Sequence, residues 1–333
     1  MTNLQKIMDK QNVTDLKRYN SRIREYGSRN VRMIKYSGNY RKGKSIGLPY
    51  QGSKKKISRK IVEIVKENFG TNKKVYDLLG GGGSVSCEFQ LQRFDITYNE
   101  KNTSVYEMFK HSLNLKNEDL KKYIISRDEF FRILDKKEKT AEDNLKLLIN
   151  SFGNDCKSYL YGVINADDKY NLAKEIIEKE GTWNNYKQTE TYKKAVSDLN
   201  IIKEKQRLEQ LERLQQLERI QELELHNKSY KDFPYLENTI IYLDPPYEDA
   251  KKYLGEYFDS QEIYDWAVEM SKKNIVLVSS YIISDERFEC IYEFTTARST
   301  MQSGVSENSS KTERLFMVKE QTKRVAERNV VGW

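Results

Sequence analysis

A run of four glycines, residues 80–83, constrains the fold of this 333-residue chain more than any other stretch. An apolar, strand-like segment at residues 74–79 precedes it, and residues 84–92 follow with the pattern of a helix. Residues 95–98 then form a second short strand, which leads to Glu100. Strand, glycine turn, helix, strand and acid, in this order, make the first half of a nucleotide-binding βαβ unit. The pattern therefore predicts an α/β fold around a parallel sheet.

The acid stands where a nucleoside ligand would need it. Glu100 lies 20 residues after Gly80, the spacing at which an acid at the end of the second strand meets the hydroxyls of a ribose. Glycines also let the backbone approach a ligand that a Cβ atom would hold off. The run has neither the GxGxxG spacing nor the basic residues of a phosphate-binding loop, so S-adenosylmethionine fits better than a dinucleotide. A plain turn between a strand and a helix is the alternative.

A second motif, Asp244-Pro245-Pro246-Tyr247, follows the apolar segment at residues 238–243. Two successive prolines have fixed φ angles and no N–H groups, so they form a rigid turn whose carbonyl groups point outward. The Asp244 carboxylate and a proline carbonyl beside the Tyr247 ring suit a flat ring that carries an exocyclic amine. A turn that only closes a buried strand is the alternative. In an open α/β sheet, both motifs would follow strands at the carboxyl edge, and we expect them to face one cleft.

Basic residues are concentrated near the start of the chain. Between Lys17 and Lys60 there are 15 lysines and arginines and one acid, which leaves the remainder with a net charge of −6 out of a total of +8. Such a block favours a polyanionic partner, most simply nucleic acid, although a solvated tail is the alternative for its first part. The 3 cysteines and 2 histidines predict neither a disulfide framework nor a metal site. Without a signal peptide or an apolar run of membrane-spanning length, we expect a cytoplasmic protein with no membrane partner.

The other segments alternate between helix and strand patterns. Residues 102–150 and 171–225 are mostly helical in pattern, and residues 274–280 read as a buried strand. Residues 291–295 and 314–318 could pair as a terminal hairpin. These patterns predict a doubly wound α/β sheet with an antiparallel addition at its C-terminal end.

Three near-copies of a hexapeptide occupy residues 208–225. Their apolar residues recur at every third position, and three residues turn an α-helix by about 300°, so these positions wind around the helix axis instead of forming one stripe. The period also differs from the 3.5 residues of a coiled coil. We expect a surface insert that acts as a spacer and takes no part in the chemistry.

Together the motifs resemble those of the Dam-type adenine-specific DNA methyltransferases, in the motif order of the alpha group and especially of its phage-encoded branch. Residues 49–54 (Pro-Tyr-Gln-Gly-Ser-Lys) are similar to the family's first cofactor motif, and residues 77–84 look like its glycine-rich motif. The Asp244 tetrapeptide looks like the catalytic motif, and residues 151–162 resemble the target-recognition segment. Leu79 departs from the pattern, because the family usually has an aromatic residue there.

The resemblance implies a Rossmann-like, class I S-adenosylmethionine-dependent methyltransferase sheet with a mostly helical, inserted target-recognition domain. The implied segments are a basic arm at residues 1–47, two parts of the catalytic domain at 48–112 and 223–333, and a recognition insert at 113–222. The likeness is strong over residues 48–112 and 223–318 and looser between them.

The resemblance also implies roles for individual residues. The implied catalytic residues are Asp244, Pro245, Pro246 and Tyr247. The implied cofactor contacts are Tyr50, Lys54, Asp77, Gly80, Gly81, Gly82, Gly83, Glu100 and Asp244. From the basic arm and the recognition segment, the candidate DNA contacts are Arg41, Lys42, Asn154, Lys157 and Tyr159. No metal is implied.

The implied reaction is a direct methyl transfer from S-adenosylmethionine to the amine of an adenine that has flipped out of double-stranded DNA. An RNA adenine methyltransferase could use the same tetrapeptide. A nucleic-acid-binding protein with a decayed methyltransferase fold is an alternative from another class. Cytosine methylation is less expected, because those enzymes more often carry serine at the position of Asp244. The target sequence, a restriction-modification partner and the oligomeric state stay open.

Overall fold

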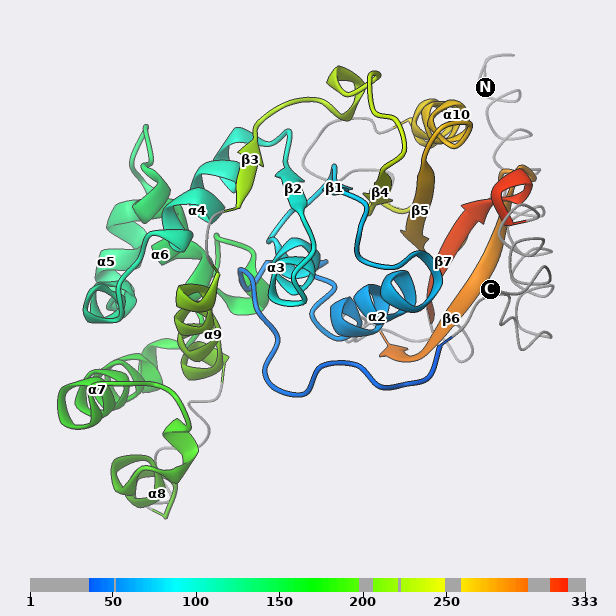
Figure 1. The fold of residues 1–333 in the computed structure, drawn as a ribbon. Coiled ribbons are helices and arrows are strands. Elements are labelled where there is room, and N and C mark those ends of the chain that lie inside the picture. Colours follow the sequence, from blue (N-terminus) through cyan, green and yellow to red (C-terminus); the bar gives the residue numbers. More distant parts are fainter. Residues whose placement is uncertain are drawn as a thin grey trace, which may run out of the picture. The chain divides into compact units, whose positions relative to one another are not determined.

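A computed structural model describes residues 36–50, 52–197, 206–220, 223–248, 259–298 and 312–322 (Figure 1). Most of the basic arm lies outside these ranges. Contacts divide the chain into two compact units: residues 1–39, 63–79 and 231–333 form the first unit, and residues 40–62 and 80–230 form the second unit. The glycine turn and the first cofactor motif therefore belong to the same unit as the helical insert. In the part of the chain that the structure describes, no helix is long and apolar enough to span a membrane.

The first unit contains strands in the order β1-β4-β5-β7-β6. Strands β1 (Val75–Asp77), β4 (Ile240–Leu243) and β5 (Ile275–Ser280) run parallel to one another. Strand β7 (Thr312–Val318) pairs antiparallel with β5 and with β6 (Phe288–Arg298). This arrangement confirms the predicted parallel sheet and its antiparallel addition.

The parallel strands are buried because their sequences are continuous apolar runs. All four residues of β4 are buried, as are the last five of β5, which is the pattern of strands covered on both faces. Helix α10 (Ser260–Met270) precedes β5 and buries Ile263, Tyr264 and Ala267. The Asp259 side chain caps this helix by accepting a hydrogen bond from the backbone N–H of Gln261 at 2.9 Å.

In the second unit, strand β2 (Ile96–Asn99) pairs in parallel with β3 (Glu224–His226). Helix α3 (Ser84–Leu91) leads from the glycine turn towards β2. Apart from residues 151–162, the described chain between β2 and β3 is mostly helical, in agreement with the helical patterns predicted for residues 102–150 and 171–225. Its α-helices are α4 (Thr103–Leu113), α5 (Arg127–Leu134), α6 (Ala141–Ile149), α7 (Val163–Glu180), α8 (Glu190–Ser197) and α9 (Gln206–Gln215). Helix α2 (Ser58–Phe69) has residues in both units.

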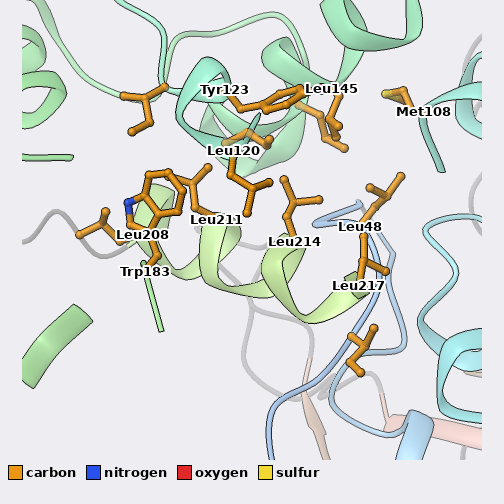
Figure 2. Close-up of a cluster of buried hydrophobic side chains, with 14 of the residues drawn as sticks. Leu48, Met108, Leu120, Tyr123, Leu145, Trp183, Leu208, Leu211, Leu214 and Leu217 are labelled. Carbon is orange, nitrogen blue, oxygen red and sulfur yellow. The ribbon is translucent and has the colours of Figure 1, made fainter. Parts of the chain in front are cut away.

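The first two copies of the hexapeptide, residues 208–219, form most of α9 and the following 3-10 turn, η4 (Gln216–Arg219), and their leucines are buried. Their leucines have exposed fractions between 0% and 3%, and Figure 2 shows them in one cluster with Leu120, Tyr123, Leu145 and Trp183. The members are Leu208, Leu211, Leu214 and Leu217. The prediction of a surface insert is therefore wrong. Leu208, Leu211 and Leu214 of α9 follow one another at about 300° per step, so they span about 120° around the helix axis and form one broad apolar face that packs into this cluster.

Polar side chains of α9 are buried as well, and other parts of the second unit supply partners for them. Glu212 accepts a hydrogen bond from the backbone N–H of Asn185 at 2.7 Å and forms an ion pair with Lys44. Gln215 accepts one from the backbone N–H of Trp183 at 3.3 Å. Because a buried polar group costs stability unless it is hydrogen-bonded, these contacts explain how a charged repeat can fill an interior.

Candidate active site

The glycine turn is shaped by the close packing of the protein around it. The backbone N–H of Gly83 donates to the carbonyl of Gly80 at 2.8 Å. A Cβ atom on Gly80 would lie 2.3 Å from the Tyr98 ring, and one on Gly83 would lie 2.2 Å from the Phe109 ring. Aromatic side chains of the second unit therefore already occupy the space beside these two glycines. Gly81 differs, because a Cβ atom there would meet only the Tyr50 ring at 3.6 Å.

The first cofactor motif lies directly against this turn. The backbone N–H of Leu48 donates to the carbonyl of Gly82 at 2.7 Å. A Cβ atom on Gly82 would lie 2.7 Å from the Cβ atom of Tyr50, so this glycine permits the approach. Lys54 is 5% exposed, and its carbonyl accepts the backbone N–H of Ser58, the first residue of α2, at 2.8 Å. The structure thus brings Tyr50, a candidate cofactor contact, next to Gly81 and Gly82.

Glu100 joins the same group of residues. One carboxylate oxygen accepts the backbone N–H of Gly81 at 2.9 Å, and the other accepts that of Asn102 at 2.8 Å. Burial raises the pKa of Glu100 above its ordinary value, although the backbone N–H groups oppose this shift. An ionised carboxylate offers about four acceptor positions. Glu100 can therefore hold the turn and still accept hydrogen bonds from ligand hydroxyls.

Two candidate site residues of the first unit, Asp77 and Asp244, stand at the ends of neighbouring parallel strands. Asp77 is the last residue of β1 and pairs in register with Tyr242 of β4, two residues before Asp244. Asp77 is 1% exposed, whereas Asp244 is half-buried. Because the carboxyl ends of parallel strands meet at one edge of a sheet, Asp77 and the start of the tetrapeptide lie at that edge.

Tyr247 is held by two residues that the sequence reasoning missed. Its ring stacks on the Tyr281 ring, with 4.0 Å between centroids and 29° between planes. Its hydroxyl donates to a carboxylate oxygen of Glu313 on β7. Burial, together with the negative charges of Asp244 and Glu313, raises the pKa of Tyr247, so the phenol stays neutral and remains a donor. Tyr281 directly follows β5, and that position at a strand's carboxyl end was a signal that could have identified it.

The predicted DNA contacts are divided between the surface and the interior. In the recognition segment, Lys157 is exposed and Phe152 is 65% exposed. Tyr159 is 6% exposed, and its hydroxyl donates to the carbonyl of Ile125 at 3.0 Å. The side-chain amide of Asn154 donates to the carbonyl of Leu148 at 3.0 Å. These bonds give Tyr159 and Asn154 structural roles within the segment.

Arg41 likewise has a structural partner. Its Nε and Nη2 atoms each lie 2.8 Å from a carboxylate oxygen of Glu88 on α3, which is a bidentate ion pair. The pKa of Arg41 is raised, mainly because its guanidinium donates hydrogen bonds to the Glu88 carboxylate. The neighbouring Lys42 is exposed, with its Nζ atom 5.6 Å from the centroid of the Tyr40 ring. Lys42 and Lys157 are therefore the predicted basic contacts that the structure leaves at the surface.

Comparison with known proteins places the chain in a class. Residues 50–276, more than half of the chain, match the family of D12 class N6 adenine-specific DNA methyltransferases, and the chain belongs to this family. It is therefore an enzyme that methylates adenine in DNA. The fold class predicted from the sequence, an α/β sheet of the Rossmann-like methyltransferase type, agrees with this assignment.

Two further comparisons add little to the family match. Among solved structures, a Haemophilus influenzae protein described as a methylase is similar, with 12% identity and a TM-score of 0.27. The similarity covers 75% of this chain and 89% of that one. No curated protein matches the chain.

Among the residues that the structure describes, no three His, Cys, Asp or Glu side chains gather as metal ligands.

Proposed function

We propose that the protein transfers a methyl group from S-adenosylmethionine to N6 of an adenine flipped out of double-stranded DNA, as a phage-like enzyme of the Dam type. The observation that carries the proposal is the contact of Glu100 with Gly81, at 2.9 Å, beside Tyr50. It joins three predicted cofactor residues, distant in sequence, into one group. Such a group of acid, aromatic ring and glycine backbone suits an adenosine without phosphates.

The residues of the second unit fit this cofactor. Glu100 would accept hydrogen bonds from the ribose hydroxyls, and Gly81 has no Cβ atom to hold the ligand away. Tyr50 and Lys54 would make the contacts of the first cofactor motif. Asp77 is proposed as a further cofactor contact from the end of β1. When bound, S-adenosylmethionine supplies a methyl group activated by its sulfonium charge.

The tetrapeptide would orient the acceptor amine. The Asp244 carboxylate and the Pro245 carbonyl would accept the two N–H groups of the adenine amine and so direct its lone pair at the methyl group. Pro246 makes the turn rigid. The Tyr247 ring would stack on the flipped base, which must leave the duplex before its amine can be reached. Most of the rate would then come from positioning and electrostatic stabilisation.

The exposed lysines would contact the duplex. Lys42 and Lys157 are proposed to bind phosphates, which fix the position of the protein on DNA without reading its sequence. Each such contact contributes to a salt-dependent affinity, because binding releases counterions from the DNA. We do not assign phosphate contacts to Arg41, Asn154 or Tyr159, because their polar groups bind other parts of the protein.

The experiment that tests the proposal uses S-adenosylmethionine labelled in its methyl group. Purified protein is incubated with the labelled cofactor and either double-stranded DNA or structured RNA of the same sequence. We expect label in the duplex DNA and none in the RNA. Label in RNA alone would reject double-stranded DNA as the substrate, and failure of the protein to bind the cofactor in a calorimetric titration would reject S-adenosylmethionine.

A further inference from the structure

Two arginines of α9, one directly before the first hexapeptide copy and one at its end, contact different parts of the second unit. Arg207 and Arg213 are six residues apart. Six residues of α-helix correspond to a rise of about 9 Å and a net rotation of about 240°. The two arginines therefore stand on different sides of a buried helix.

Arg213 connects the two cofactor loops. Its Nη2 atom donates to the hydroxyl of Ser53 at 2.9 Å and to that of Ser84 at 2.7 Å. Ser53 belongs to the first cofactor motif, and Ser84 begins α3 directly after the glycine turn. The two hydroxyls are also 2.7 Å from each other. One guanidinium group thus holds together the segments that carry Tyr50 and the glycines.

The charge of Arg213 makes this contact unusual. The residue is 8% exposed, and the partners of its guanidinium among the described residues are neutral oxygens. Burial lowers the pKa of Arg213 to about 10, so the group remains a cation at neutral pH. A buried cation without an anionic partner is costly. Hydrogen bonds to the two hydroxyls offset part of this cost, and a planar guanidinium fixes their directions in a way that a lysine cannot.

Arg207 contacts the recognition segment instead. It is 0% exposed, and its Nη2 atom donates to the hydroxyl of Tyr159 at 2.7 Å. Its guanidinium also lies 5.1 Å from the centroid of the Tyr161 ring. Both tyrosines belong to residues 151–162, in which an antiparallel bridge joins Ser151 and Tyr159. Arg207 therefore supports the base of the turn that exposes Lys157.

We propose that α9 is an internal support for both substrate-binding segments, with Arg213 positioning the cofactor loops and Arg207 positioning the recognition segment. This inference rests on the proposed function, because it assigns each segment to the substrate proposed for it. Both arginines act through other residues and touch no reacting atom. Helix α9, which contains part of the repeat, thus contacts both of the segments proposed to bind substrates.

The test compares Arg213→Met with Arg207→Met, two changes that remove the same buried side chain from the same helix. For Arg213→Met we expect the Kd of S-adenosylmethionine, measured by calorimetry, to rise about 10- to 100-fold, the effect of losing hydrogen bonds to a charged group. For Arg207→Met we expect the KM for duplex DNA to rise by about the same factor. Arg213→Met should leave the KM for duplex DNA near the wild-type value, and Arg207→Met should do the same for the Kd of S-adenosylmethionine. Arg219→Met, an exposed change at the same repeat position, should alter neither constant.

A double variant, Ser53→Ala with Ser84→Ala, removes the two hydroxyls without touching α9. It should weaken cofactor binding in the same direction as Arg213→Met, and it replaces that variant as the test if thermal unfolding shows that Arg213→Met is not folded. If each arginine variant raised the Kd of S-adenosylmethionine and the KM for duplex DNA by similar factors, the proposal would be overturned, because such effects would indicate general destabilisation. Unchanged cofactor binding in the serine double variant would overturn it as well. Wild-type protein that binds no S-adenosylmethionine would instead reject the proposed function, and this inference with it.

Discussion

The glycine turn and the Asp244 tetrapeptide both begin shortly after a parallel strand ends, yet the protein holds them in different ways. The turn is surrounded by backbone and aromatic rings so closely that three of its four glycines have no room for a Cβ atom. The tetrapeptide is stiffened by its own prolines, and Tyr247 is held by a stacked ring and a hydrogen bond. The turn should therefore be sensitive to any added atom, and the tetrapeptide to the chemistry of its side chains.

The largest effect is expected for kcat when the Asp244 carboxylate is removed. Asp244→Ala removes the carboxylate proposed to orient the adenine amine, and we expect kcat to fall by about 1,000-fold or more, as for the loss of a main transition-state contact. Duplex DNA binding, measured by gel shift, should persist because the phosphate contacts remain. Methyl transfer by this variant at the wild-type rate would contradict the role given to the tetrapeptide.

The next effect is on stability and tests the packing of the turn. Gly83→Ala places a methyl group against Phe109 at a residue with a φ of 71°, and we expect a loss of about 2–4 kcal/mol in the free energy of unfolding. Gly81→Ala is the matched control, because its φ is 50° but no atom lies closer than 3.6 Å. It should cost about 1–2 kcal/mol, from the backbone conformation alone. Equal losses in chemical denaturation would show that packing around the turn does not matter.

Glu100 makes cofactor binding sensitive to acid. In the proposed site, ribose hydroxyls would donate to the ionised carboxylate of Glu100, and burial raises the pKa of this carboxyl above its ordinary value. Affinity for S-adenosylmethionine should therefore be full at neutral pH and fall as the pH is lowered through this raised pKa, at higher pH than an ordinary glutamate would allow. Calorimetric titrations over a pH series measure this fall.

Glu100→Gln provides the control for that pH series. It should bind the cofactor more weakly at neutral pH, and its affinity should not change over the same acidic range because glutamine does not titrate. A wild-type profile as flat as that of the variant would contradict the assignment of Glu100 to the ribose.

The smallest effect is expected at the Tyr247 hydroxyl. Tyr247→Phe keeps the ring stacked on Tyr281 but removes the hydrogen bond to Glu313, and we expect the methylation rate to fall by about 2- to 10-fold. Tyr281→Ala, which removes the stacked ring and leaves Tyr247 intact, should cause a larger fall. If Tyr247→Phe has the greater effect, the hydroxyl and not the stack positions this residue.

Features that depend on local sequence were predictable, and the glycine turn is the clearest case. Its strand, turn, helix and second strand have signals within about 25 residues, so the position of Glu100 directly after the second strand followed from the local pattern. The tetrapeptide could be placed at a strand end for the same reason. The terminal hairpin of β6 and β7 was predictable from two apolar runs, because buried neighbouring strands of a sheet carry such runs.

Features that depend on distant partners were not predictable from the sequence. Nothing in the repeat indicates which segments surround α9, so its leucines could be expected at the surface. Arg41 and Tyr159 look like DNA contacts because they are basic or aromatic in polar segments, but Glu88 and Ile125 bind them in the folded chain. The sequence shows the type of each side chain, whereas its partner is determined by tertiary structure.

The central claim is that the protein methylates N6 of adenine in double-stranded DNA with S-adenosylmethionine as the donor. The most direct test is mass spectrometry of the nucleosides released from duplex DNA after incubation with the purified protein and labelled cofactor. We expect labelled N6-methyldeoxyadenosine as the methylated product, formed by Asp244→Ala about 1,000-fold more slowly or slower still. Label in methylated cytosine, or wild-type yield from Asp244→Ala, would contradict the central claim.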